Sequence, residues 1–164
     1  MVAAWLLWTD RADQVWLLPT FSHPFSKELL QFDERVRMCR ALAAAIHPAV
    51  QVCTIERELP VPSYTVDTLD QLSTRHPEHH FRLVIGADVL AQTGAWKSWD
   101  RIETSYPPHV VGRLGYPKVP GAVSFPEVSS TEIRRRRAAR EPYSHLVPAS
   151  VAVLYDALPH RSAH

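Results

Sequence analysis

The sequence predicts an α/β domain built on a parallel sheet, and three observations lead to that prediction. Several short apolar runs have the length and composition of buried parallel strands. Stretches of helical length separate these runs, so strands and helices alternate along the chain. The 164 residues contain no repeat and no low-complexity segment. We therefore expect a single domain over residues 1–158 and a frayed tail over 159–164.

Each element follows from its own pattern of apolar and breaker residues. The strands are expected where a short apolar run meets proline, glycine or a polar loop, namely at 14–18, 50–55, 81–86, 109–113 and 123–125. The helices are expected where apolar side chains recur at helical spacing or a cap precedes them, namely at 1–8, 32–46, 63–76, 89–96, 97–103, 128–140 and 148–158.

The N-terminal order of these elements is unusual for such a domain. Residues 1–8 resemble the middle of a buried helix, because no N-cap precedes their apolar side chains. The chain thus opens with a helix followed by the strand at 14–18. We expect that a preceding strand belongs to this fold and is missing from the sequence.

Composition limits the class of protein. Hydrophobic residues make up 46% of the chain and charged residues 21%, with a formal net charge of +1, as in soluble globular proteins. This balance gives no reason to expect nucleic-acid or membrane partners. Cys39 and Cys53 are too few for a disulfide framework and fit reduced, buried thiols. The expected location is the cytoplasm.

A candidate phosphate site begins at Ser129. Ser129 and Glu132 have the spacing of a capping box, which predicts a helix start with free backbone N–H groups. Ser130, Thr131 and Arg134 follow, and Arg134 projects on the same side as the two hydroxyls. Such an arrangement suits a phosphate group. An ordinary capped helix with a solvated basic face remains the alternative.

Other polar groups follow the predicted strands. Gly86 and Asp88 come directly after the strand at 81–86, where a ribose can be held by its hydroxyls, although a plain strand-to-helix turn is common there. Trp96 can stack on a planar ring or simply cover the core. Lys27 and Arg134 can neutralise phosphate or remain solvated. Arg113 ends the predicted strand at 109–113 and belongs with these groups. Together they outline a nucleotide site along one edge of the sheet.

Three other kinds of chemistry find no support in the sequence. No nucleophilic triad, P-loop or G-x-G-x-x-G fingerprint is present. His76, His79 and His80 lack a cysteine or carboxylate at ligand spacing, so a solvated turn is favoured over a metal site. We therefore expect no protein-held metal.

The order of several motifs resembles the bacterial nicotinate-nucleotide adenylyltransferase family. The motifs are VWLLPT…HPFSK (15–27), SYTVDTL (63–69), FRLVIGADVL…WKSW (81–99), VSSTEIR (128–134) and SHLVPASVAVLY (144–155). The resemblance covers nearly the whole chain. It implies a Rossmann-like nucleotidyltransferase fold and transfer of AMP from ATP to nicotinate mononucleotide with Mg²⁺, which gives deamido-NAD and pyrophosphate.

The resemblance also implies roles for individual residues. The ATP phosphates would be held by Ser129, Ser130, Thr131 and Arg134, with Lys27 as a second catalytic cation. The adenylate ribose would meet Gly86 and Asp88. Thr65 and Thr68 would lie near the nicotinate carboxylate, and Trp96 would stack on the pyridine ring.

This sequence departs from the family at two places. It lacks the opening strand and its His-x-Gly-His loop, so we expect an N-terminally truncated fold with marginal stability and weak activity. The family's Arg-Pro-Gly appears as Arg113–Leu114–Gly115. Three alternatives stay open: a nucleotide-binding relic without turnover, a different acceptor such as nicotinamide mononucleotide or phosphopantetheine, and a basic patch at 134–140 that binds nucleic acid. The oligomeric state is not predicted.

Overall fold

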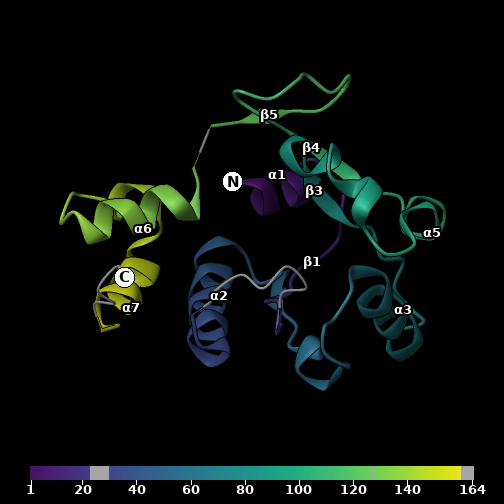
Figure 1. Cartoon of the computed structure of the whole chain (residues 1–164), viewed down its shortest axis with the longest axis horizontal. Coiled ribbons are helices and arrows are strands. Elements are labelled where there is room, and N and C mark those ends of the chain that lie inside the picture. Colours follow the sequence, from purple (N-terminus) through teal and green to yellow (C-terminus); the bar gives the residue numbers. More distant parts are fainter. Residues whose placement is uncertain (23–29, 127, 160–164) are drawn as a thin grey trace.

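The structure, a computed structural model, describes residues 1–22, 30–126 and 128–159. Helices and strands alternate along the chain as predicted (Figure 1). The α-helices are α1 (Val2–Trp8), α2 (Phe32–Ile46), α3 (Thr65–Arg75), α4 (Ala87–Leu90), α5 (Trp99–Ser105), α6 (Ser130–Ala138) and α7 (Ala149–Asp156). The strands are β1 (Val15–Leu17), β2 (Val50–Val52), β3 (Val84–Gly86), β4 (His109–Arg113) and β5 (Ser124–Phe125). Short 3₁₀ helices are η1 (Ile55–Glu58), η2 (Thr93–Ala95) and η3 (Ser144–Leu146).

The strands are all parallel, but they form two sheets. One sheet has the order β1-β2 and the other has the order β3-β4-β5. Within the described part of the chain, no backbone ladder joins β1 to β3. The predicted parallel pairing is therefore confirmed, whereas the described strands do not form a single continuous sheet.

Helix α1 packs between the two sheets. Its Ala3 belongs to a core cluster with Ala43 of α2 and Val50 of β2. On another side of the same helix, the Trp5 ring lies 5.5 Å from the His109 ring and 5.8 Å from the Phe125 ring. Only Ala3 and Leu6 of this short apolar helix are fully buried, although it has a sheet on each side, and Figure 1 shows it close to β3 and β4.

A second core lies on the far side of the β3 strand. Val66 and Leu69 of α3 pack there with Ile102 of α5, and Phe81 and Leu83 pack against this cluster. The apolar run that predicted a strand over 81–86 therefore serves two purposes. Only its last three residues pair with β4, and the earlier Phe81 and Leu83 pack against this cluster.

The prediction of one continuous helix over 89–96 is wrong. The chain forms α4, a turn and then η2. Thr93 is buried and its hydroxyl donates to the carbonyl oxygen of Leu90 at 2.8 Å, which closes a tighter turn. Gly94 follows, and glycine is a poor helix former.

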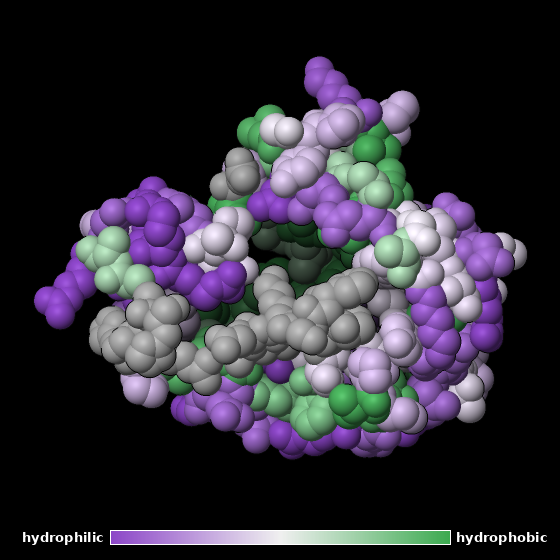
Figure 2. Space-filling view, viewed as in Figure 1, coloured by the Kyte–Doolittle hydropathy of each residue, from purple (hydrophilic) through white to green (hydrophobic). Residues whose placement is uncertain are grey.

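The C-terminal helices stand on one side of the molecule, and α3 and α5 stand on the other (Figure 1). Helix α7 packs against α2, whereas no residue of α6 is buried. The face between these sides is hollowed near its centre, with apolar residues on its floor and polar residues on much of its rim (Figure 2). None of the helices in the described ranges is both long and apolar enough to cross a membrane.

Candidate functional site

The first turn of α6 has the predicted cap. The Ser129 hydroxyl accepts a hydrogen bond from the Glu132 backbone N–H at 3.1 Å, and Ser129 has extended backbone angles, as an N-cap requires. Ser130 and Thr131 are exposed on this turn. Arg134 donates to the Thr131 hydroxyl at 3.1 Å, so its guanidinium is held beside that hydroxyl. A phosphate could bind there to backbone N–H groups, hydroxyls and one arginine.

Glu132 does not complete the capping box. Its carboxylate accepts from Arg135 at 2.8 Å and from Arg136 at 2.7 Å instead of turning back to Ser129. Hydrogen bonds from Arg135 and then Arg136 lower the pKa of Glu132 to about 2. Arg135 also binds Glu141 at 2.9 Å. Arg135 and Arg136 are thus both paired with carboxylates.

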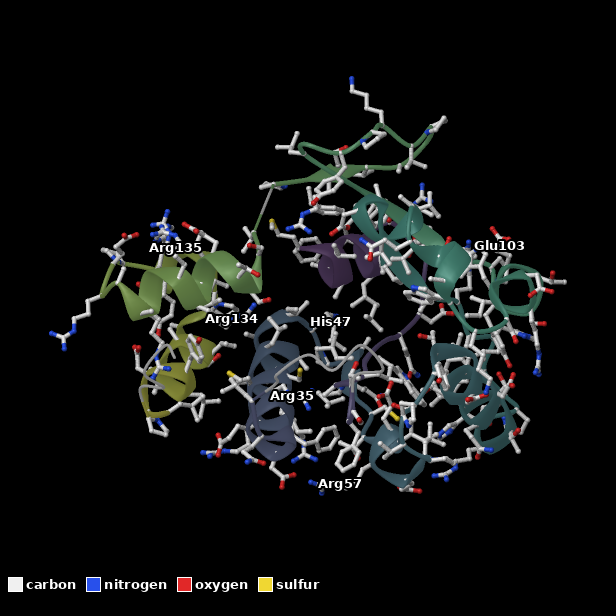
Figure 3. All side chains as sticks on the ribbon, in the orientation of Figure 1. Arg35, His47, Arg57, Glu103, Arg134 and Arg135 are labelled. Atoms are coloured by element: carbon white, nitrogen blue, oxygen red, sulfur yellow. The ribbon has the colours of Figure 1, made fainter. Side chains whose placement is uncertain are left out.

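Arg134 differs from these neighbours. Among the described residues, no carboxylate forms an ion pair with it. Figure 3 shows Arg134 and Arg135 leaving α6 on opposite sides. Of these two arginines, Arg134 is the one whose charge is left for an anion at the helix start.

A second group of residues lies where β3 ends. Asp88 is in the first turn of α4 and forms an ion pair with Arg113, the last residue of β4, at 2.5 Å. Gly86 lies so close to the Asp88 carboxylate that a side chain there would clash with it. The predicted ribose residues are therefore neighbours. Arg113 was predicted to lie at the same edge of the sheet, but its ion pair with Asp88 was not predicted.

A third group surrounds the start of α3. Tyr64 is the N-cap but makes no side-chain cap hydrogen bond, and Thr65 is half-buried. Thr68 is buried, and its hydroxyl donates to the Tyr64 carbonyl at 3.2 Å. The hydroxyl of Thr68 therefore stabilises the helix, and the backbone of the first turn is what remains for an anionic ligand.

Trp96 packs against the core cluster that contains Val66 of α3. It also lines an open pocket of about 550 Å³ with Ala91, Gln92, Gly94 and Ala95. The neighbouring Lys97 bridges to Asp67 of α3 at 2.7 Å. Both alternatives for Trp96 therefore have support, since one part of the ring covers the core and another faces the pocket.

Lys27 lies outside the described residues. The described chain before and after it makes two contacts. The Phe21 backbone N–H donates to Glu56 at 2.9 Å, and Arg35 donates to the Leu30 carbonyl at 2.9 Å.

The three groups do not form one continuous cluster. In the described residues, no hydrogen bond or ion pair connects the first turn of α6 with Asp88 or with α3. The α6 group is on one side of the molecule in Figure 1, and the α3 group is on the other.

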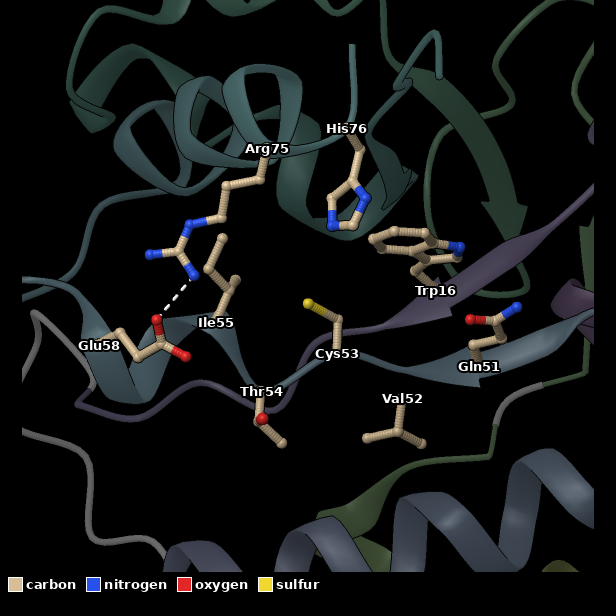
Figure 4. A pocket seen from close by; sticks show the side chains of 9 residues that line it. All are labelled: Trp16, Gln51, Val52, Cys53, Thr54, Ile55, Glu58, Arg75 and His76. Atoms are coloured by element: carbon tan, nitrogen blue, oxygen red, sulfur yellow. Dashed lines mark hydrogen bonds and ion pairs between the residues drawn. The ribbon is translucent and has the colours of Figure 1, made fainter. Parts of the chain in front are cut away.

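A separate pocket of about 290 Å³ contains none of the predicted residues (Figure 4). Cys53 and His76 point into it, and its arginine, Arg75, is paired with Glu58 at 2.6 Å. Because that charge is neutralised within the pocket, this space offers less to a phosphate than the α6 turn does.

The cysteines and histidines differ from the sequence prediction in their surroundings. Cys39 and Cys53 are free, as predicted, but only half-buried, and burial raises the pKa of the Cys39 thiol. His76 and His79 are not in a fully solvated turn. Their rings lie edge-on to Trp16 at 4.9 and 5.5 Å. No three His, Cys, Asp or Glu side chains in the described ranges are grouped to hold a metal ion.

Comparison with known proteins agrees with the fold and the motifs. A cytidylyltransferase-like family model matches residues 8–136. A relative from Anaeromyxobacter sp. (strain K), named "probable nicotinate-nucleotide adenylyltransferase", is 48% identical over 92% of this chain and 82% of its own length. A protein of the same name from Myxococcus xanthus (strain DK1622) is 41% identical over 91% of this chain and 79% of its own length.

A solved structure supports the fold alone, since it is only 14% identical. It is the Plasmodium falciparum nicotinic acid mononucleotide adenylyltransferase complexed with NaAD, and it matches with a TM-score of 0.77 over 95% of this chain and 86% of that chain. The Rossmann-like nucleotidyltransferase fold is therefore shown by structure, and the family is shown by sequence. This chain belongs to the cytidylyltransferase-like family and, within it, to the nicotinate-nucleotide adenylyltransferases.

Proposed function

We propose that this chain transfers AMP from ATP to nicotinate mononucleotide, giving deamido-NAD and pyrophosphate in NAD biosynthesis. The names of its relatives at 48% and 41% identity support this reaction. The observation that carries the proposal within the structure is the α6 start, where Ser129 caps the helix and Arg134 keeps its charge while Arg135 and Arg136 are paired with Glu132.

The reaction needs one bond to form and one to break. A phosphate oxygen of nicotinate mononucleotide attacks the α-phosphorus of ATP, the bond from that phosphorus to the α–β bridging oxygen breaks, and pyrophosphate leaves. Such a transfer depends on alignment and on charge stabilisation more than on covalent help from the protein. We assign Arg134 and Lys27 to the charge on the phosphates, and Ser129, Ser130 and Thr131 to their orientation.

The remaining predicted residues position the two nucleosides. Gly86 and Asp88 are assigned to the adenylate ribose, because a carboxylate accepts hydroxyl hydrogen bonds. Trp96 is assigned to the pyridine ring, and the first turn of α3 at Thr65 and Thr68 to the nicotinate carboxylate. Because these groups lie apart, we propose that ATP and its acceptor together span the distance between them.

Mg²⁺ is part of the proposal, but the described residues do not form a site for it. They contain no group of three potential ligands, and the Asp88 carboxylate is already bound to Arg113. Mg²⁺ is commonly held largely by substrate phosphates. We therefore propose that it arrives with ATP and supplies positive charge there, and we assign it no protein ligand.

We propose further that residues 1–158 act as one nucleotidyltransferase domain and that the cytoplasm, where ATP is consumed, is its place of action.

Two alternatives to the proposed function predict different results in an assay. A relic would bind ATP without turnover, and a different acceptor would replace nicotinate mononucleotide. Measuring pyrophosphate release with ATP and each acceptor in turn tests the proposed function against both alternatives. We expect the fastest release with nicotinate mononucleotide, and faster release with nicotinamide mononucleotide or phosphopantetheine would overturn the acceptor assignment.

A further inference from the structure

Arg113 reaches the ribose residues from the neighbouring strand. In the parallel pairing of β3 and β4, Gly86 lies opposite Val111. Two residues further along each chain stand Asp88 and Arg113, and their side chains meet above the sheet edge. Arg113 Nη1 lies 2.5 Å from Asp88 Oδ2.

The pair is partly shielded from water. The side chains of Arg113 and Asp88 are 24% and 22% exposed, whereas the arginine and aspartate of the Arg101–Asp70 pair are 57% and 27% exposed. An ion pair with less solvent around it is screened less, so it fixes its partner more firmly. The Asp88 carboxylate is therefore held on its Oδ2 side.

Gly86 leaves room for the other side of the same carboxylate. A Cβ atom at Gly86 would lie 2.2 Å from Asp88 Oδ1, a distance that no real side chain allows. Oδ1 therefore occupies the space that a side chain would take. Gly86 thus makes room for this orientation of the carboxylate, and the contact that fixes it is the bond of Oδ2 to Arg113.

We propose that Arg113 is a positioning residue that holds the Asp88 carboxylate for a ribose hydroxyl of ATP. This inference rests on the proposed function, because the ribose assignment of Asp88 belongs to it. A carboxylate has about four acceptor positions, and one bond to Arg113 leaves others for a hydroxyl. Without the guanidinium, the carboxylate can rotate away, and the hydroxyl loses a fixed acceptor.

The test compares nucleotides that differ in one hydroxyl. Binding of ATP, 2′-deoxy-ATP and 3′-deoxy-ATP is measured by calorimetry on the full chain and on Arg113→Met. The native chain should bind ATP about tenfold more tightly than the analogue that lacks the hydroxyl held by Asp88. In Arg113→Met that ratio should fall towards one, because ATP loses affinity while the deoxy analogue does not. Arg113→Lys, which keeps the charge, should restore part of the ratio.

Arg101→Met is the matched control, since it also removes the arginine of an arginine–aspartate pair but lies outside the site. It should leave the ratio unchanged. Circular dichroism establishes that each variant is folded. If Arg113→Met does not fold, Arg113→Gln, which also removes the charge, carries the same comparison.

Two results would separate this inference from the function on which it rests. If Arg113→Met loses affinity equally for all three nucleotides, or keeps the ratio of the native chain, the role of Arg113 is overturned and the proposed function still stands. A native chain that binds no ATP would overturn the proposed function itself.

Discussion

At the scale of single residues, the arginines of α6 have different roles despite their adjacency. Arg135 and Arg136 clamp Glu132, and Arg137 lies over the Tyr155 ring at 4.5 Å. Arg134 has only the Thr131 hydroxyl beside it among its described hydrogen bonds. Helical spacing in the sequence separates Arg134, three residues after Thr131, from Arg135 and Arg136, which follow Glu132 by three and four residues. The contacts of Arg135 with Glu141 and of Arg137 with Tyr155 could not be predicted, because they depend on how the chain folds back after α6.

Arg134→Ala should lower kcat/KM for ATP by about a hundredfold, since a charged donor that faces developing phosphate charge contributes on this scale. Arg40→Ala is the control, because Arg40 is an exposed arginine of α2 and its substitution removes the same charge at another place. Initial rates of pyrophosphate release measure both variants. An Arg134→Ala rate equal to that of Arg40→Ala would remove Arg134 from the site.

At the scale of elements, α6 depends on its cap and its ion pairs. None of its residues is buried, so tertiary packing contributes little to holding it. The cap at Ser129 was predictable because a Ser–x–x–Glu spacing is local in sequence. The direction of the Glu132 carboxylate was not, since Arg135 and Arg136 compete for it with the backbone N–H of the N-cap.

Two substitutions at Ser129 separate helix capping from phosphate binding. Ser129→Ala should weaken α6 by about 1 kcal/mol, and hydrogen exchange of its amides should become faster. Ser129→Asp should keep slow exchange, because aspartate is also a good N-cap, yet it should weaken ATP binding by placing an anion at the phosphate site. Tight ATP binding by Ser129→Asp would show that the phosphates do not approach this turn.

The clamp around Glu132 should respond to acid in a defined range. Arg135 and Arg136 lower the pKa of Glu132 to about 2, below its ordinary value of 4.5. A carboxyl whose pKa is lower in the folded chain than in the unfolded chain stabilises the fold at every pH above its unfolded-state pKa. This contribution is lost as the pH falls through the folded-state pKa. An NMR titration of the Glu132 carboxyl should therefore show protonation well below pH 4. A midpoint near 4.5 would mean that the clamp does not form in solution.

At the scale of the whole molecule, sequence predicted the alternation of helices and strands but not the division into two sheets. Local periodicity reports which side chains are buried, whereas strand pairing is a non-local property. Phe81 and Leu83 illustrate this, since their apolar character fits a strand and also fits the cluster with α3 that they join. The register that brings Arg113 to Asp88 is non-local in the same way.

The contacts between the two sheets should contribute measurably to stability. The Trp16 ring of β1 lies 5.3 Å from the Phe81 ring, just before β3. Trp16→Ala should cost about 2 kcal/mol, less than a fully buried tryptophan because its side chain is only half-buried. Trp8→Ala, at a position 76% exposed, should change stability by less than about 0.5 kcal/mol. Urea unfolding measures both variants, and equal midpoints would show that Trp16 does not connect the sheets.

The central claim is that this chain joins AMP to nicotinate mononucleotide. Mass spectrometry of the products after incubation with ATP, Mg²⁺ and nicotinate mononucleotide tests it most directly. We predict deamido-NAD and pyrophosphate in equal amounts, above a reaction without protein. Binding of both substrates with no deamido-NAD would contradict the claim and identify a nucleotide-binding protein without transferase activity.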